Sequence, residues 1–169
     1  MYGSRSKGTR NHHGHASASY QLYVHLVWPT KYRKPVLGKK LSPVIESMIA
    51  EVCQTKQYQL IIARAVVDHV HVLLGYKPTH CVSGVVRDLK SNSAKVAFEK
   101  FSRLPEIIKM DVLWAEGYRA ESVSPLNLEG TKRYIENQAN HHREKLEFRR
   151  RQDEKNVDYG DIVLEGHLD

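Results

Sequence analysis

The segment Asp68–Leu74, with the sequence DHVHVLL, limits the possible folds more than any other part of the chain. Side chains of a β-strand alternate between two faces, so a strand here has one unbroken Val/Leu face and a second face carrying His69, His71 and Leu73. We expect the apolar face to pack against helices, which leaves the two imidazoles side by side on a rigid sheet. Because neutral imidazole is the commonest protein ligand for divalent metals, the pair predicts the first two ligands of a metal site.

The rest of the sequence supplies the elements of a single α+β domain. A chain of 169 residues with a hydrophobic fraction of 41% can bury one core of ordinary size. Strand composition covers residues 20–28, 58–67, 69–76 and 114–124, and helical periodicity covers 41 or 42 to 52, 81 or 82 to 101, and about 129–149. This order predicts a four-stranded antiparallel sheet with two helices on one face, ferredoxin-like or RRM-like, and a C-terminal helix left over. The open face, with the histidines, would suit nucleic acid.

Polar segments flank this domain at both ends. Residues 1–18 contain Gly, Ser, Arg, His and Asn with almost nothing to bury, which predicts a disordered basic tail. His12, His13 and His15 in this tail could bind a metal, but we favour a solvated tail. Residues 150–169 turn from basic to acidic and predict a second, acidic tail. The folded domain is therefore expected over 19–149.

The charge of the chain favours a polyanionic partner. The formal net charge is +7, and Lys and Arg are spread along the whole sequence, so nucleic acid is the first expectation and an anionic membrane the second. No apolar run approaches the roughly 18–20 residues that span a bilayer, and no secretory signal is recognisable, so we expect no membrane partner. The two cysteines, Cys53 and Cys81, form no CxxC pair. A reducing cytoplasm is the expected location.

Tyr134 and Gln138 are the second candidate for chemistry. They lie four residues apart in the last predicted helix, and therefore on one face of it. A tyrosine hydroxyl is a weak nucleophile alone, but near a divalent metal that polarises a phosphate it can attack phosphorus in line. The amide oxygen of Gln138 is a hard ligand, which favours Mg²⁺ or Mn²⁺ over Zn²⁺. The alternative is that Tyr134 only packs, and that the two histidines are partly exposed residues at the edge of the core.

Four motifs carry a resemblance to a known family. They are Lys31–Lys34 (KYRK), Asp68–Leu74, Trp114–Tyr118 (WAEGY) followed by Ser122–Ser124 (SVS), and Tyr134–Gln138 (YIENQ). Over about residues 20–142 the chain resembles the single-tyrosine HUH transposases of small insertion sequences, the TnpA-like proteins. The resemblance implies that 19–149 is an HUH transposase-like catalytic domain. In it, His69 and His71 would be the metal-binding pair, Tyr134 the nucleophile, and Gln138 the residue that completes the metal shell.

The resemblance also implies an activity and an assembly. Members of the family cleave single-stranded DNA at hairpin-flanked ends, forming a 5′-phosphotyrosine and a free 3′-OH, and they work as homodimers in which the tyrosine helix completes the partner's active site. One tyrosine per subunit is a separate reason to expect a dimer, because two cleavages then need two subunits. Two alternatives stay open: a host-domesticated tyrosine nuclease of the REP-associated type, and a protein that binds DNA hairpins without cleaving them.

Candidates for DNA contact follow from the chemistry of their side chains. The basic candidates for phosphate contacts are Lys31, Arg33, Lys34, Arg87, Lys90 and Arg119. The aromatic candidates for base stacking are Tyr23, Trp28, Tyr32 and Trp114. For any one of the cations, a solvated surface charge is the competing interpretation, and for Trp114 it is core packing.

Overall fold

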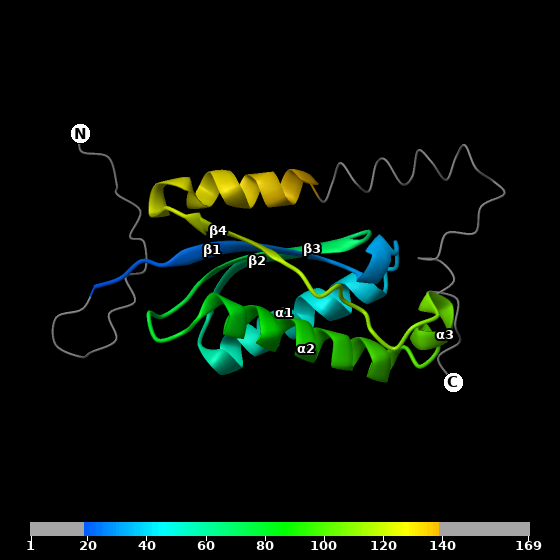
Figure 1. The fold of residues 1–169 in the computed structure, drawn as a ribbon. Coiled ribbons are helices and arrows are strands. Elements are labelled where there is room, and N and C mark those ends of the chain that lie inside the picture. The colour runs from blue at the N-terminus through cyan, green and yellow to red at the C-terminus, as the bar shows by residue number, and fades with distance from the viewer. Residues whose placement is uncertain (1–18, 139–169) are drawn as a thin grey trace.

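The computed structural model of the chain describes residues 19–138. Its elements, drawn in Figure 1, are β1 (Tyr23–Pro29), η1 (Lys31–Arg33), α1 (Leu41–Lys56), β2 (Gln59–Val66), β3 (His69–Gly75), α2 (Val82–Lys100), α3 (Leu104–Ile108), β4 (Arg119–Val123), η2 (Pro125–Asn127) and a C-terminal helix over 128–138. The two predicted tails, 1–18 and 150–169, and the predicted end of the last helix, 139–149, lie outside the described residues.

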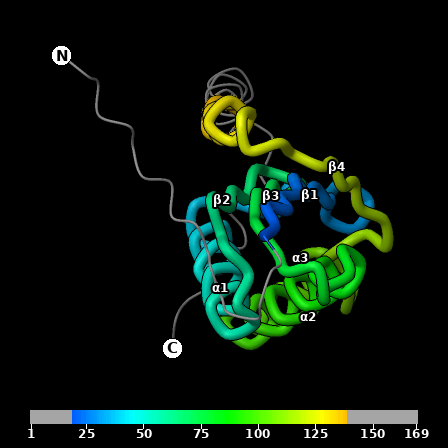
Figure 2. The backbone as a smooth tube through the Cα atoms, turned by 90° about the vertical axis from the view of Figure 1, so that its left-hand side faces the viewer, coloured from blue at the N-terminus to red at the C-terminus, as the bar shows by residue number. Residues whose placement is uncertain are grey.

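The four strands form one antiparallel sheet in the order β2-β3-β1-β4, which confirms the predicted α+β class. β3 lies inside the sheet between β2 and β1, and all seven of its residues are buried. α1 and α2 cover one face of the sheet, and the C-terminal helix lies over the opposite face (Figures 1 and 2). The sheet is therefore a middle layer between two α-helices and a single helix.

The predicted alternation along β3 divides the buried residues into two clusters. Val70, Val72 and Leu74 belong to the large core beneath α1 and α2. Leu73, from the histidine face, packs instead in a small cluster with Ile62 of β2 and Ile135 of the C-terminal helix. The contact of Ile135 explains why the C-terminal helix stays over the histidine face, because this side chain is completely buried there.

A tight turn at Val67 and Asp68 joins β2 to β3. Val67 has a φ of 51°, which is rare for a β-branched residue. Two backbone hydrogen bonds hold the turn: the Leu37 amide donates to the Val67 carbonyl at 2.9 Å, and the Thr30 amide donates to the Asp68 carbonyl at 2.8 Å. The turn thereby fixes the Asp68 carboxylate beside the first histidine of β3.

The predicted strand 114–124 was wrong in its first half, since β4 begins only at Arg119. Trp114 makes a single isolated bridge to the sheet and is 5% exposed. Its indole Nε1 donates to the Lys90 carbonyl and to the Ser93 hydroxyl, each at 3.1 Å. Trp114 is therefore a core residue that ties the chain before β4 to α2, as the core-packing interpretation had it.

Candidate active site

His69 and His71 lie next to each other on the face of β3 that looks toward the C-terminal helix. Both side chains are buried, with 9% and 6% of their surface exposed. Their rings meet nearly edge to face, with centroids 4.8 Å apart, and the two Nε2 atoms are separated by 3.0 Å. The strand thus presents two imidazole nitrogens to one point in space, as the alternation predicted.

The orientation of His69 is fixed by Asp68. Nδ1 of His69 lies 2.6 Å from Oδ1 of Asp68, while the other carboxylate oxygen accepts a hydrogen bond from Nε of Arg33 at 3.0 Å. An ionised carboxylate only accepts hydrogen bonds, so the ring carries its proton on Nδ1 and leaves Nε2 with a lone pair. Carboxylate–histidine pairs of this kind orient metal ligands in proteins.

The orientation of His71 is fixed by a third histidine, His25 of β1, which the sequence analysis missed. Nε2 of His25 lies 3.0 Å from Nδ1 of His71, and the two rings are stacked with an interplanar angle of 14°. Alternation along β1 turns Val24 and Leu26 toward the large core and His25 toward the site. A histidine within a predicted strand was the available signal, but only the β1–β3 register places it beside His71.

Glu121 of β4 continues this chain of contacts. It is the register partner of His25, and its Oε2 lies 3.5 Å from His25 Nδ1. A short ion pair with Arg119 holds the pKa of the Glu121 carboxyl below its ordinary value. Burial lowers the pKa of His25, and the nearby Glu121 carboxylate opposes this only in part. At neutral pH the pair is therefore a neutral imidazole beside a carboxylate.

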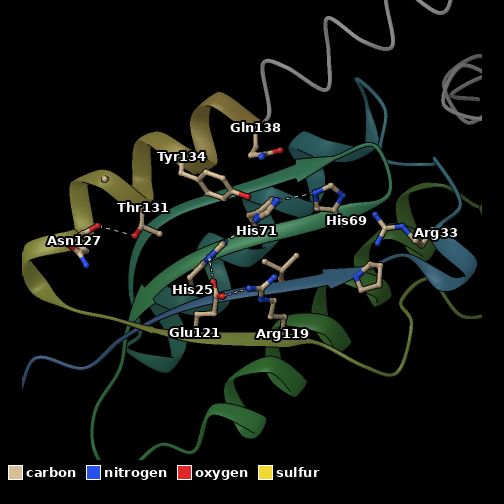
Figure 3. A pocket seen from close by; sticks show the side chains of 13 residues that line it. His25, Arg33, His69, His71, Arg119, Glu121, Asn127, Thr131, Tyr134 and Gln138 are labelled. Atoms are coloured by element: carbon tan, nitrogen blue, oxygen red, sulfur yellow. Dashed lines mark hydrogen bonds and ion pairs between the residues drawn. The ribbon is translucent and has the colours of Figure 1, made fainter.

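Tyr134 reaches the same place from the C-terminal helix. Its ring stands edge-on to His25 and to His71, with a centroid distance of 6.4 Å to each, and its hydroxyl points toward His71 (Figure 3). About half of the side chain, 51%, is exposed. Gln138 projects from the same helix one turn later (Figure 3). Both residues line a cavity of about 680 Å³ together with the two histidines. All four residues come from one chain.

The geometry of the histidine pair fits a divalent metal. The two Nε2 atoms lie within hydrogen-bond distance at 3.0 Å, so one proton lies between them, and a cation bound at this place would take the position of that proton. Adjacent ligands of an octahedral ion with bonds of about 2.1 Å also lie about 3.0 Å apart. Within residues 19–138 no three His, Cys, Asp or Glu side chains are placed to hold a metal. A complete shell would therefore need the oxygen of Gln138 and oxygens from water or substrate.

The six basic candidates for DNA contact divide into two groups. Only Arg33 and Arg119 line the cavity, and each is paired with a carboxylate. Arg87 and Lys90 lie on α2, which covers the opposite face of the sheet (Figure 1). Lys90 moreover donates to the carbonyls of the loop that follows Trp114.

The two lysines of the KYRK loop also make contacts within the protein. Lys34 donates to the Ile108 carbonyl, and Lys31 lies 3.8 Å from Glu116. Among the aromatic candidates, Tyr32 is 77% exposed, whereas Trp28 is completely buried in the core and is not available for stacking on a base. The prediction for Trp28 was therefore wrong.

Comparisons with known proteins agree on one family. The model of the family described as "Transposase IS200 like" matches residues 18–138. The chain is 30% identical to the ISDra2 transposase TnpA of Deinococcus radiodurans over 119 residues, which cover 70% of this chain and 85% of that protein. It is 27% identical to the transposase of insertion element IS200 of Salmonella typhimurium over 108 residues, 64% of this chain and 71% of that protein.

A solved structure extends the likeness to three dimensions. The crystal structure of a protein from Deinococcus radiodurans R1, assigned as a transposase, superposes with a TM-score of 0.61 at 31% sequence identity. The superposition covers 75% of this chain and 96% of that one.

In the part of the chain that the structure describes, no helix is long and apolar enough to cross a membrane.

Proposed function

The chain belongs to the IS200-like transposase family, and we propose that it cleaves and rejoins single-stranded DNA at hairpin-flanked ends through a covalent bond to Tyr134. The observation that carries the proposal is the position of the Tyr134 hydroxyl, which points toward a pair of histidines whose Nε2 atoms are 3.0 Å apart. A phosphodiester placed in this cavity would meet a nucleophile on one side and the histidine pair on the other.

His69, His71 and Gln138 are the residues that would hold Mg²⁺ or Mn²⁺. The bound ion would polarise a phosphate oxygen and offset the negative charge that develops during attack on phosphorus. Asp68 and its Arg33 partner keep the first histidine oriented toward this position.

Cleavage then exchanges one phosphoester for another. The Tyr134 oxygen loses its proton and bonds to phosphorus, the bond from phosphorus to the 3′ oxygen breaks, and the 3′ oxygen takes up a proton and leaves as a 3′-OH. The 5′-phosphotyrosine retains the energy of the broken bond. Attack by a 3′-OH on this ester reverses the sequence and releases Tyr134, so rejoining needs no ATP.

The assembly that we propose is a homodimer in the cytoplasm, with the C-terminal helix of each subunit serving the metal site of its partner. Within one described chain Tyr134 already faces the histidines, anchored by Ile135. The same contact would hold the helix on either subunit, since the docking surface formed by Ile62 and Leu73 is identical in both. A subunit-mixing experiment distinguishes the two arrangements and is described among the predictions below.

The direct test is a covalent adduct. The full chain is incubated with a hairpin-bearing single-stranded oligonucleotide in Mg²⁺, and adducts are trapped on denaturing gels and mapped by peptide analysis. We expect the adduct at Tyr134, and its loss in Tyr134→Phe and in His69→Ala. Tyr118→Phe is the matched control, because Tyr118 is 42% exposed but is not part of the cavity lining. An adduct at another residue, or one retained in Tyr134→Phe, refutes the proposal.

Binding measurements on the same proteins separate the competing functions. A chain that binds the hairpin with no adduct in either metal would be a hairpin-binding protein. Imperfect palindromes in the DNA that flanks the gene would mark a mobile element, and their absence would favour a domesticated nuclease with the same chemistry.

A further inference from the structure

We propose that His25 is a positioning residue, which together with Glu121 holds His71 in the tautomer and orientation that direct Nε2 toward the metal. The inference rests on the proposed function and deepens it. Nothing in the motifs of the family resemblance includes His25, which lies on β1, 46 residues before His71 in the chain.

The contacts form a continuous line through three strands of the sheet. Glu121 on β4 lies opposite His25 on β1, and His25 contacts Nδ1 of His71 on β3. Figure 3 shows the side chains of Glu121, His25 and His71 following one another toward His69. Because neighbouring strands fix each pair, the line does not depend on flexible loops.

The direction of the hydrogen bonds follows from the chemistry of the two ends. The Glu121 carboxylate, kept ionised by Arg119, favours a proton on His25 Nδ1, so Nε2 of His25 is left as an acceptor. When a cation takes the place of the proton between the two Nε2 atoms, His71 donates from its own Nδ1 to His25, and its lone pair is on Nε2. This is the atom that lies 3.0 Å from Nε2 of His69. The chain of contacts therefore selects the metal-binding tautomer.

Packing alone does not account for His25. The side chain is only 5% exposed, and a polar group buried without a partner costs more than an apolar side chain of similar size at the same place. Its neighbour on the same face of β1, Val27, is apolar. A histidine at position 25 is explained by the two polar contacts that it makes, one on each ring nitrogen.

A neutral linker also suits a site that receives phosphate. His69 is oriented directly by the Asp68 carboxylate, at 2.6 Å. Glu121 also lines the cavity, but His25 lies between it and His71, and the ion pair with Arg119 offsets its charge. The tautomer of His71 is thus set without placing a second carboxylate in contact with a metal ligand.

The test compares three variants of the full chain without DNA. His25→Leu removes the acceptor, whereas His25→Gln places an amide oxygen near the former position of Nε2. His80→Leu is the matched control, since His80 is also a partly buried histidine but packs on Tyr58 away from the cavity. Mn²⁺ affinity is measured by electron paramagnetic resonance, and the tautomer of His71 in the presence of diamagnetic Mg²⁺ by ¹⁵N NMR of the imidazole nitrogens.

We expect His25→Leu to weaken Mn²⁺ binding by about 10- to 100-fold, the usual cost of losing a residue that orients a metal ligand. His25→Gln and His80→Leu should remain near the wild-type affinity. In the wild type with Mg²⁺, His71 should carry its proton on Nδ1, and in His25→Leu at the same Mg²⁺ concentration this preference should be reduced.

Two results would overturn the inference: unchanged Mn²⁺ affinity in a folded His25→Leu protein, or a wild-type His71 that stays protonated on Nε2 in saturating Mg²⁺. The second needs no variant, so it remains decisive if His25→Leu fails to fold. A wild type that binds no Mn²⁺ would instead refute the metal site of the proposed function.

Discussion

Replacing Ile135 by Ala should release the C-terminal helix from the sheet while leaving the rest of the fold intact. Ile135 is completely buried, and its partners Ile62 and Leu73 form a cluster separate from the large core under α1 and α2. The substitution therefore acts on the completely buried contact of the C-terminal helix, which holds Tyr134 over the histidines together with the partly buried Leu128. It does not remove the nucleophile or any proposed metal ligand.

The size of the effect follows from the buried carbons. Ile→Ala removes three carbon atoms, at about 0.8 kcal/mol for each, so the docked state loses about 2.4 kcal/mol before any cavity term is added. This energy corresponds to a factor of about 50 in the docking equilibrium. Ile135→Val removes one carbon and should cost about fourfold. Ala is the better helix former of the two, so loss of helicity does not contribute to the effect.

Two measurements check this graded series. Amide hydrogen exchange reports the docking of residues 128–138, and the rate of adduct formation in Mg²⁺ reports the position of Tyr134. Both should change in the order wild type, Ile135→Val, Ile135→Ala, with the cleavage rate falling by up to about 50-fold in Ile135→Ala. Leu126→Ala is the control, because Leu126 precedes the same helix but is 93% exposed. If Ile135→Ala cleaves at the rate of Leu126→Ala, the helix is not held by this contact and the reasoning fails.

Two further predictions concern assembly and the thiols. Mixing Tyr134→Phe subunits with His69→Ala,His71→Ala subunits should restore cleavage if the sites are shared between subunits, whereas a mixture that stays inactive would place each site within one chain. Burial raises the pKa of the Cys53 thiol to about 12, and a hydrogen bond from a nearby serine lowers the pKa of the exposed Cys81 thiol. A disulfide-exchange reagent at pH 8 should therefore label one thiol rapidly, and Cys81→Ala should abolish this fast phase. Two fast phases in the native protein would contradict the assigned burial.

The central strand could be predicted from the sequence because its two faces differ in composition. Val70, Val72 and Leu74 are apolar at every second position, and this pattern alone determined which face of β3 enters the large core. The helix that carries Tyr134 was likewise predicted, from its apolar stripe. In both cases the information is local: a periodicity within one element fixes the orientation of its own side chains.

The sequence was less informative wherever a contact joins distant elements. The composition of residues 114–118 resembled a strand, but Trp114 makes an isolated bridge to Thr30, and its indole is held by Ser93 of α2. Helix α3 was not predicted, although its Pro105 lies in the first turn, where a proline is tolerated. The charge of Lys90 suggested a DNA contact, while its ammonium group donates to carbonyls near the start of β4. The errors at residues 114–118 and at α3 concern contacts between elements that no local pattern specifies, while the DNA contact of Lys90 stays a prediction.

The difference between local patterns and contacts of distant elements also explains why the motif residues could be found from the sequence, whereas the residue that positions one of them could not. A metal ligand or a nucleophile is defined by its own chemistry, so His69 and Tyr134 stand out in a single sequence. His25 carries the same imidazole but gains a role only from the register that places it between Glu121 and His71. A one-residue slip of β1 would turn His25 into the large core and bring Leu26 to the site. The site therefore depends on strand register as much as on its motifs. Positioning residues such as His25 should be sought among the buried polar side chains of the strands that neighbour a motif strand.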